Sequence, residues 1–110
     1  MEDTSNENIQ DKIDEKMEHL KDAGNYDDAI KILYENVLPI QINSLGDKHP
    51  DVATTYYYMA DAYDNKGDYD KAMELYEKCL AIRLNKLGDE HTETKETQEK
   101  IGLIKKALQK

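Results

Sequence analysis

Residues 45–91 read LGDKHPDVATTYYYMADAYDNKGDYDKAMELYEKCLAIRLNKLGDEH, and this stretch decides the fold. It begins with LGDKH at 45–49 and ends with LGDEH at 87–91, so nearly the same residues return after 42 positions (87 minus 45). A fixed period of this length is typical of chains in which one supersecondary unit is stacked repeatedly. The sequence therefore predicts a repeat architecture.

Two helices are predicted inside this stretch, over 50–66 and 69–87. Gly67 suits the left-handed residue that ends the first helix, and Asp68 suits the N-cap of the second. Helical spacing places four apolar residues on one face of the first helix: Tyr56, Met59, Ala60 and Tyr63. The predicted buried side of the second helix is formed by Tyr69, Ala72, Leu75, Tyr76, Cys79, Leu80, Ile82 and Leu87.

This pattern resembles a tetratricopeptide repeat. The resemblance covers residues 45–91 and extends to 24–44, and the 42-residue period with its LG-x-x-H linker resembles the longer variant found in kinesin light chains and nephrocystin-type proteins. It implies an all-α fold, an α-α superhelix (solenoid) whose inner surface holds peptide segments of other proteins. The residues that follow the family's large-small pattern are Tyr56, Met59, Ala60, Tyr63, Gly67, Tyr69, Ala72, Tyr76 and Cys79, the last standing where Ala is commoner.

The whole chain is expected to form five antiparallel helices, or about two and a half repeats. A disordered tail is predicted over 1–6, followed by a single tetratricopeptide repeat domain over 7–110. The terminal helices carry fewer apolar residues than the central ones, as terminal repeats usually do. The predicted helices span residues 7–22, 26–45, 50–66, 69–87 and 93–109.

The second helix is expected to be irregular. The turn at Gly24 precedes its equivalent at Gly67 by 43 residues (67 minus 24), but LYENVLPIQINSLGD at 33–47 precedes LYEKCLAIRLNKLGD at 75–89 by 42 (75 minus 33). One extra residue is thus expected between Ala29 and Leu33. It would rotate the following residues by ~100° unless a π-type turn absorbs it.

Charge and composition limit the function. Fifteen basic and 24 acidic residues give a net charge of −9, which argues against binding to nucleic acid or to an anionic membrane. No apolar run approaches the ~20 residues that span a bilayer, and the acidic start MEDTSNEN is unlike a targeting peptide. Cys79 is the single cysteine, so no intramolecular disulfide can form. A cytoplasmic location is expected.

No residues with catalytic or cofactor-binding geometry are predicted. His49 and His91 occupy equivalent linker positions one repeat apart, so we interpret them as helix caps or linker packing residues rather than metal ligands. Cys79 is interpreted as a buried small side chain, because no Lys, Arg or His is predicted beside it to stabilise a thiolate. The chain is therefore expected to be no enzyme and to need no cofactor or metal.

The resemblance also implies which residues line the concave groove. In the family, the first helix of each hairpin lines it at fixed positions of the pattern. Carried over to this chain, these positions are Thr54, Tyr57, Asp61 and Asp64 in the central repeat, Asp11, Asp14, Glu18 and Lys21 in the first helix, and Glu96, Glu99, Leu103 and Lys106 in the last. Seven of these twelve residues are acidic, so the groove is predicted to be negative.

A negative groove favours a basic or amphipathic protein or peptide partner. Family members that clamp the carboxylates of chaperone C-termini use Lys, Arg and Asn where this chain has Asp14, Tyr57 and Asp61, and an acidic tail would be repelled. The aromatic rings of the groove would contact the aliphatic stems of basic residues. Of the adjacent pair Tyr57 and Tyr58, Tyr57 is expected to face the groove, whereas Tyr26 and Tyr34 are expected to pack inside. The carboxylates could equally serve only to solvate the helix surface.

A second hypothesis follows from the length of the chain. About three repeats are usually needed to bury a continuous core, and only two and a half are predicted here. On this hypothesis the chain is a structural unit that associates with a second copy through its first or last helix, forming a homo-oligomer, or a fragment of a longer solenoid. Both alternatives stay open beside peptide binding.

Overall fold

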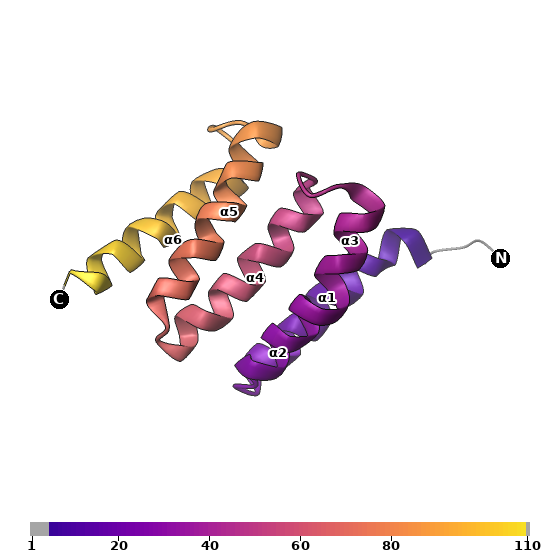
Figure 1. The fold of residues 1–110 in the computed structure, drawn as a ribbon, viewed down its shortest axis with the longest axis horizontal. Coiled ribbons are helices and arrows are strands. Elements are labelled where there is room, and N and C mark those ends of the chain that lie inside the picture. The colour runs from indigo at the N-terminus through magenta and orange to yellow at the C-terminus, as the bar shows by residue number, and fades with distance from the viewer. Residues whose placement is uncertain (1–4, 110) are drawn as a thin grey trace.

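The computed structural model describes residues 5–109, with side chains described from Asp11 onward, and every regular element in this part of the chain is helical (Figure 1). Segments α2, η1 and α3 follow one another without a break, so they form the second of five helices. The predicted all-α fold is confirmed. The elements are α1 (Ser5–Asp22), α2 (Tyr26–Ile32), the π-helical segment η1 (Leu33–Val37), α3 (Leu38–Leu45), α4 (Pro50–Lys66), α5 (Tyr69–Leu87) and α6 (Thr92–Leu108).

The ends of the chain differ slightly from the prediction. Helix α1 begins at Ser5, within the tail predicted over 1–6, and residues 1–4 lie outside the described residues. No Gly or Pro interrupts the chain between Ser5 and Asp22, so nothing stops the helix from extending toward the N-terminus. Helix α6 spans 92–108, within one residue of the approximate bounds predicted for it, and α4 and α5 span the residues predicted for them.

Helix α4 lies at the centre of the array. On one side it packs against α1 and α2, and on the other against α5, which in turn packs against α6 (Figure 1). Met59 of α4 belongs to an apolar cluster with Met17 and Leu20 of α1, Ala29 of α2 and Leu33 of η1. Ala60, the next residue of α4, belongs to another cluster with Ala72, Tyr76, Ile101 and Ile104. Each hairpin therefore buries its apolar face against its neighbour, as stacked repeats do.

The predicted turn between α4 and α5 is present. Gly67 has φ of 87°, a left-handed conformation that side chains with a Cβ rarely adopt. Its amide donates to the Asp64 carbonyl at 3.0 Å, and the amide of Asp68 donates to the Tyr63 carbonyl at 2.9 Å. Asp68 Oδ1 accepts a hydrogen bond from the Lys71 amide, as expected of an N-cap.

The predicted π-type turn is confirmed, but its place in the chain was predicted wrongly. Leu33 precedes Tyr76 by 43 residues (76 minus 33) and both are fully buried at 0% exposure, whereas Gln41 precedes the likewise buried Arg83 by 42 (83 minus 41). The shift of one residue therefore falls after Leu33, in η1, and not between Ala29 and Leu33. Alignment of the two LYE triplets makes Tyr34 equivalent to Tyr76. Burial shows instead that Leu33 occupies the position equivalent to Tyr76.

This register leaves Tyr34 on the surface. It is 62% exposed, although its aligned counterpart Tyr76 is fully buried. The prediction that Tyr34 packs inside is therefore wrong. Its rotation out of the core follows from the extra residue in η1.

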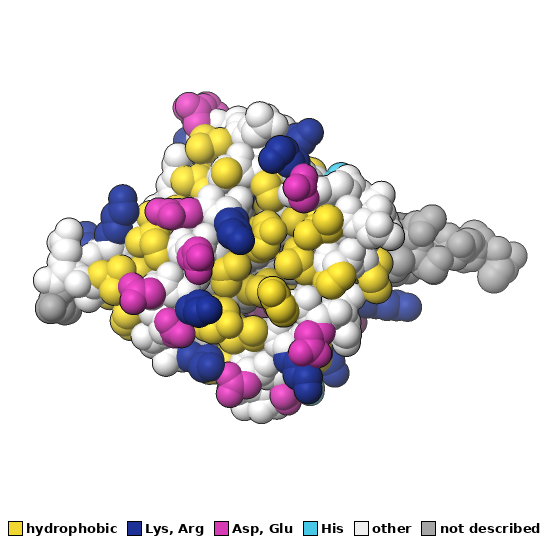
Figure 2. Space-filling model, in the orientation of Figure 1, with side chains coloured by type: hydrophobic (Ala, Val, Ile, Leu, Met, Phe, Trp, Pro, Cys, Tyr) yellow, Lys and Arg dark blue, Asp and Glu magenta, His cyan; other side chains and the backbone are white. Residues whose placement is uncertain are grey.

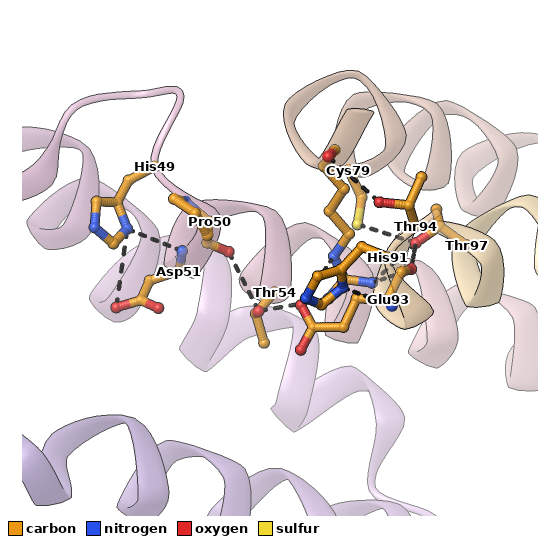
Figure 3. A network of polar contacts seen from close by, with 10 residues as sticks. His49, Pro50, Asp51, Thr54, Cys79, His91, Glu93, Thr94 and Thr97 are labelled. Atoms are coloured by element: carbon orange, nitrogen blue, oxygen red, sulfur yellow. Dashed lines mark hydrogen bonds and ion pairs between the residues drawn. The ribbon is translucent and has the colours of Figure 1, made fainter. Parts of the chain in front are cut away.

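The two linkers end in equivalent helix caps. His49 Nδ1 accepts a hydrogen bond from the Asp51 amide at 3.0 Å, and His91 Nδ1 accepts one from the Glu93 amide at 3.1 Å (Figure 3). Each histidine thus satisfies an amide that the first helical turn leaves unpaired. The interpretation of His49 and His91 as caps is confirmed.

Candidate functional site

A hollow lies between α1 and α4, on the side of the molecule that carries the predicted groove residues. Tyr57, Tyr58 and Asp61 of α4 form one wall, and Glu18 and Lys21 of α1 form part of the other. Its volume is about 110 Å³, well below the ~300–1,000 Å³ of pockets that enclose small-molecule ligands. The hollow has room for a side chain of a partner rather than for a small-molecule substrate.

Asp61 joins three helices at this hollow. Its carboxylate lies 3.4 Å from Lys21 Nζ of α1 and 3.6 Å from Lys100 Nζ of α6. The side chain of Asp61 is only 16% exposed, whereas that of Lys21 is 52% exposed and free to move away. The negative charge of Asp61 is therefore offset by lysines from two neighbouring helices. Lys100 was missed because it lies outside the positions that the family pattern assigns to the groove.

Tyr58 also lines the hollow, contrary to the expectation that Tyr57 alone would do so. Its hydroxyl donates a hydrogen bond to Asp14 Oδ1 of α1, which ties α4 to the first helix. Burial and the bond to Asp14 raise the pKa of Tyr58 above the ordinary tyrosine value. Asp14, predicted as a groove residue, is thus engaged in holding the wall of the hollow together.

Tyr57 lines the hollow and also contacts two residues of α5. Its ring meets the Tyr76 ring edge to face with centroids 5.4 Å apart, and the guanidinium carbon of Arg83 lies 5.0 Å from its centre. Burial, with smaller contributions from the charges of Glu96 and Asp61, raises the pKa of Tyr57 to about 12. The carboxylates of Asp61 and Glu96 therefore lie close enough to Tyr57 to act on its hydroxyl.

The remaining predicted residues occupy different surroundings. Asp64 is half-buried, and burial raises its pKa, while the nearby Lys100 opposes that rise and Asp61 adds to it. Asp64 is not part of the hollow between α1 and α4. Asp11 and Glu18 are exposed on α1, and Glu96 and Glu99 are exposed on α6.

Thr54 is engaged by a polar network that the sequence did not predict. Its hydroxyl donates to the Pro50 carbonyl at 3.3 Å and accepts from Arg83 Nη2 at 3.5 Å. Arg83 is only 4% exposed and also donates through Nη1 to the Glu93 carbonyl and to Thr97 Oγ1, at 3.2 and 2.9 Å. Thr54 therefore serves packing between α4, α5 and α6 rather than an open groove surface.

A signal for this network is present in the repeat. Thr55 Oγ1 of α4 donates to Gln41 Oε1 of α3. Thr97 follows Thr55 by 42 residues (97 minus 55), as Arg83 follows Gln41. Comparison of Gln41 with Arg83, which occupy equivalent positions of the two hairpins, could therefore have revealed a buried polar site in each hairpin. Arg83 Nε, however, has no hydrogen-bond partner among the described residues.

The surroundings of Cys79 differ from the prediction, because Arg83 lies near its thiol. Figure 3 shows Cys79 beside Thr94 and Thr97 between α5 and α6, and its Sγ lies 3.8 Å from Thr97 Oγ1. Burial raises the pKa of the Cys79 thiol, while the nearby Arg83 lowers it to a smaller extent. A cation therefore does lie near this thiol, but burial outweighs it and favours the neutral form.

The raised tyrosine pKa values predict loss of stability in alkali. Because Tyr57 titrates near 10 in the unfolded chain and at about 12 in the fold, its contribution to stability is complete below pH 10 and is lost as the pH rises toward 12. We expect the denaturation midpoint in urea to fall over that interval. The Tyr57→Phe variant, measured by circular dichroism, should lose less stability between these pH values than the parent. An equal loss in both proteins would contradict the assignment.

Among residues 5–109, no group of three or more His, Cys, Asp or Glu is arranged to hold a metal ion. Within the same part of the chain, no helix has both the length and the apolar character needed to cross a membrane.

Antiparallel helical hairpins stacked about α4, with a hollow between α1 and α4, define an α-helical repeat protein. The family model for the tetratricopeptide repeat matches residues 18–85, more than half of the chain, so the chain belongs to the tetratricopeptide repeat family. A comparison with curated proteins finds no match. Membership of this family implies a scaffold for protein–protein interaction.

Proposed function

We propose that the groove along α1, α4 and α6 binds a basic or amphipathic segment of a partner protein, and that the protein acts as a non-enzymatic cytoplasmic adaptor. The observation that carries this proposal is the hollow between α1 and α4, where two tyrosine rings lie beside the carboxylates of Glu18 and Asp61. A lysine or arginine side chain combines an aliphatic stem with a charged head. It therefore fits both parts of this hollow.

Binding would proceed by exchange of ion pairs at Asp61. Lys21 is half-exposed and lies 3.4 Å from Asp61, so a ligand cation can take its place without disturbing the core. The net gain in binding free energy from such an exchange is small, because one ion pair replaces another. Most of the affinity would come from contact with Tyr57 and Tyr58 and from the exposed carboxylates of Glu18, Glu96 and Glu99. An acidic segment would face these carboxylates and be repelled.

The test uses a synthetic fluorescent peptide of alternating Lys and Leu and a matched peptide in which Glu replaces every Lys. Fluorescence anisotropy is measured with the parent and with the Glu18→Gln/Asp61→Asn variant, which removes two carboxylates from the hollow. We expect the variant to bind the basic peptide about tenfold more weakly, a loss of ~1.4 kcal/mol. Added salt should weaken binding to the parent.

The control variant is Asp70→Asn/Glu77→Gln. Both of these residues are exposed on α5, outside the groove, and the variant changes the net charge by the same amount. It should bind the basic peptide as the parent does. Equal weakening in both variants would mean that overall charge, and not the groove, attracts the peptide. Equal binding of the acidic and basic peptides to the parent would contradict the proposal.

A further inference from the structure

An apolar surface lies on the side of the molecule away from the groove. Figure 2 shows hydrophobic side chains gathered over the middle of one face, with basic and acidic side chains around them. We call this surface the outer patch and define it by residues of α2, η1, α3 and α5: Ile30, Tyr34, Pro39, Ile40, Ile42 and Leu75.

The outer patch and the groove use opposite sides of α4. Tyr57 and Asp61 face the groove, whereas Met59 and Tyr63 lie two residues further on and form the floor between α2 and α5. Two residues correspond to a rotation of ~200° about the helix axis. A molecule bound to one surface therefore leaves the other free.

The π-helical segment creates the most exposed part of the outer patch. Tyr34 is 62% exposed because the extra residue in η1 turns it out of the core, and Ile40 of α3 is 66% exposed. No charged residue occurs between Glu35 and Asp47, although 35% of the residues in the chain are charged. Contiguous exposed apolar surface on a folded protein marks an interaction site.

The charges around the outer patch indicate what could cover it. The hollow over its floor is lined by four lysines and three acidic residues: Lys31, Lys66, Lys71, Lys78, Asp27, Glu35 and Glu74. The chain as a whole carries −9, so two copies repel each other wherever their acidic surfaces meet. At the outer patch the charges nearly cancel, and lysines of one copy can face carboxylates of the other.

We propose that two copies of this chain associate through the outer patch, with the same surface of each copy in contact. Closed twofold pairing is the commonest form of self-association, and it requires a surface that is complementary to itself. An apolar centre with neighbouring charges of both signs meets that requirement. Lys31 and Glu35 on one wall, and Glu74 and Lys78 on the other, place both signs on each side of the floor.

The location differs from the terminal helices, where the sequence predicted self-association. Leu103 and Leu108 of α6 are also exposed, at 57% and 46%, and they provide the matched comparison. The Tyr34→Ser/Ile40→Ser variant alters the outer patch, and the Leu103→Ser/Leu108→Ser variant alters α6. All four side chains are exposed, so neither variant removes a buried contact, and circular dichroism verifies that both are folded.

Sedimentation velocity of the parent at two concentrations about a hundredfold apart measures the association. We expect a dimer at the higher concentration, a dissociation constant at least tenfold larger for the Tyr34/Ile40 variant, and no change for the Leu103/Leu108 variant. The Lys71→Glu/Lys78→Glu variant should also dissociate more readily, because its outer patch becomes negative.

Three outcomes would overturn the proposal. A parent that stays monomeric at both concentrations would leave the outer patch to a different protein. A dimer lost only in the Leu103/Leu108 variant would place self-association on the last helix. A dimer that the Tyr34/Ile40 variant retains unchanged would place it elsewhere. The groove proposal is tested separately, because the Tyr34/Ile40 variant should still bind the basic peptide.

Discussion

Deletion of Asn36 is expected to leave the protein folded, whereas deletion of Glu77 is expected to unfold it. Both residues are exposed and helical, Asn36 in η1 and Glu77 in α5. If surface exposure alone decided the effect, the two deletions should reduce stability equally little. The different outcome follows from the register of the two helices.

Removing Asn36 removes the extra residue that η1 absorbs. In the shortened chain, Leu33 would keep its buried position, and Val37, Leu38 and Gln41 would follow in the register of Cys79, Leu80 and Arg83. A regular α-helix can then present the same buried faces to α4. We expect the free energy of unfolding to change by no more than about 1 kcal/mol.

Removing Glu77 has no such compensation, because α5 is regular from Tyr69 to Leu87. The residues after the deletion would rotate by ~100° about the helix axis. Cys79, Ile82 and Arg83, which are buried against α4 and α6, would leave their places together. Because losing one large buried apolar side chain costs ~2–5 kcal/mol, we expect a loss exceeding about 4 kcal/mol.

Helical circular dichroism during urea titration measures both variants against the parent. A cooperative transition near that of the parent is expected for the Asn36 deletion, and little or no folded baseline for the Glu77 deletion. If both deletions unfold the protein, the extra residue is not absorbed in η1. If both are tolerated, α5 can shift its register and the α5 packing is less specific than the structure shows.

Arg83→Ala is expected to destabilise the protein by about 3 kcal/mol, the second largest effect. The substitution removes hydrogen bonds to the Glu93 carbonyl and Thr97, and the contact with the Tyr57 ring, from a site that is 4% exposed. It also leaves a cavity where α4, α5 and α6 meet.

Arg83→Gln should cost less, about 1 kcal/mol. The first hairpin already places Gln41 at this position, where it accepts a hydrogen bond from Thr55, and Thr97 could donate to a glutamine in the same way. Arg83→Met keeps the volume without the hydrogen bonds, so it separates packing from polar contacts. Lys86→Ala, an exposed position on α5, is the control and should change stability by less than ~0.5 kcal/mol.

Chemical denaturation in urea gives the four free energies. If Arg83→Ala matches the Lys86→Ala control, the buried network contributes nothing to stability. If Arg83→Met is as stable as the parent, packing of the stem matters and the hydrogen bonds do not.

Much of the fold was predictable because its signals are local. Gly67 and Asp68 end one helix and begin the next through their own conformations and hydrogen bonds, and His49 and His91 cap helices through amides two residues away. Apolar spacing within each helix identified the faces that pack. The mismatch between the 43- and 42-residue offsets also predicted a π-type turn, because any such difference must be absorbed within a single helix.

The groove was predictable only in part. The family pattern identifies several positions that line the hollow, but it omits Lys100 and does not say which side chains form ion pairs. Lys21 and Lys100 reach Asp61 from α1 and α6, 40 and 39 residues away in the chain (61 minus 21 and 100 minus 61). Their ion pairs depend on how three helices stack, which no local spacing encodes.

The sequence by itself determined the repeat, the helices and the acidic character of the groove residues, because periodicity, turn residues and charge are properties of short stretches. Only the tertiary structure decided that Leu33 and not Tyr34 enters the core, that Arg83 is buried, and that two lysines neutralise Asp61. Each of these depends on which surfaces of α4 meet their neighbours. Burial and ion pairing arise between helices, so they appear only when the helices are assembled.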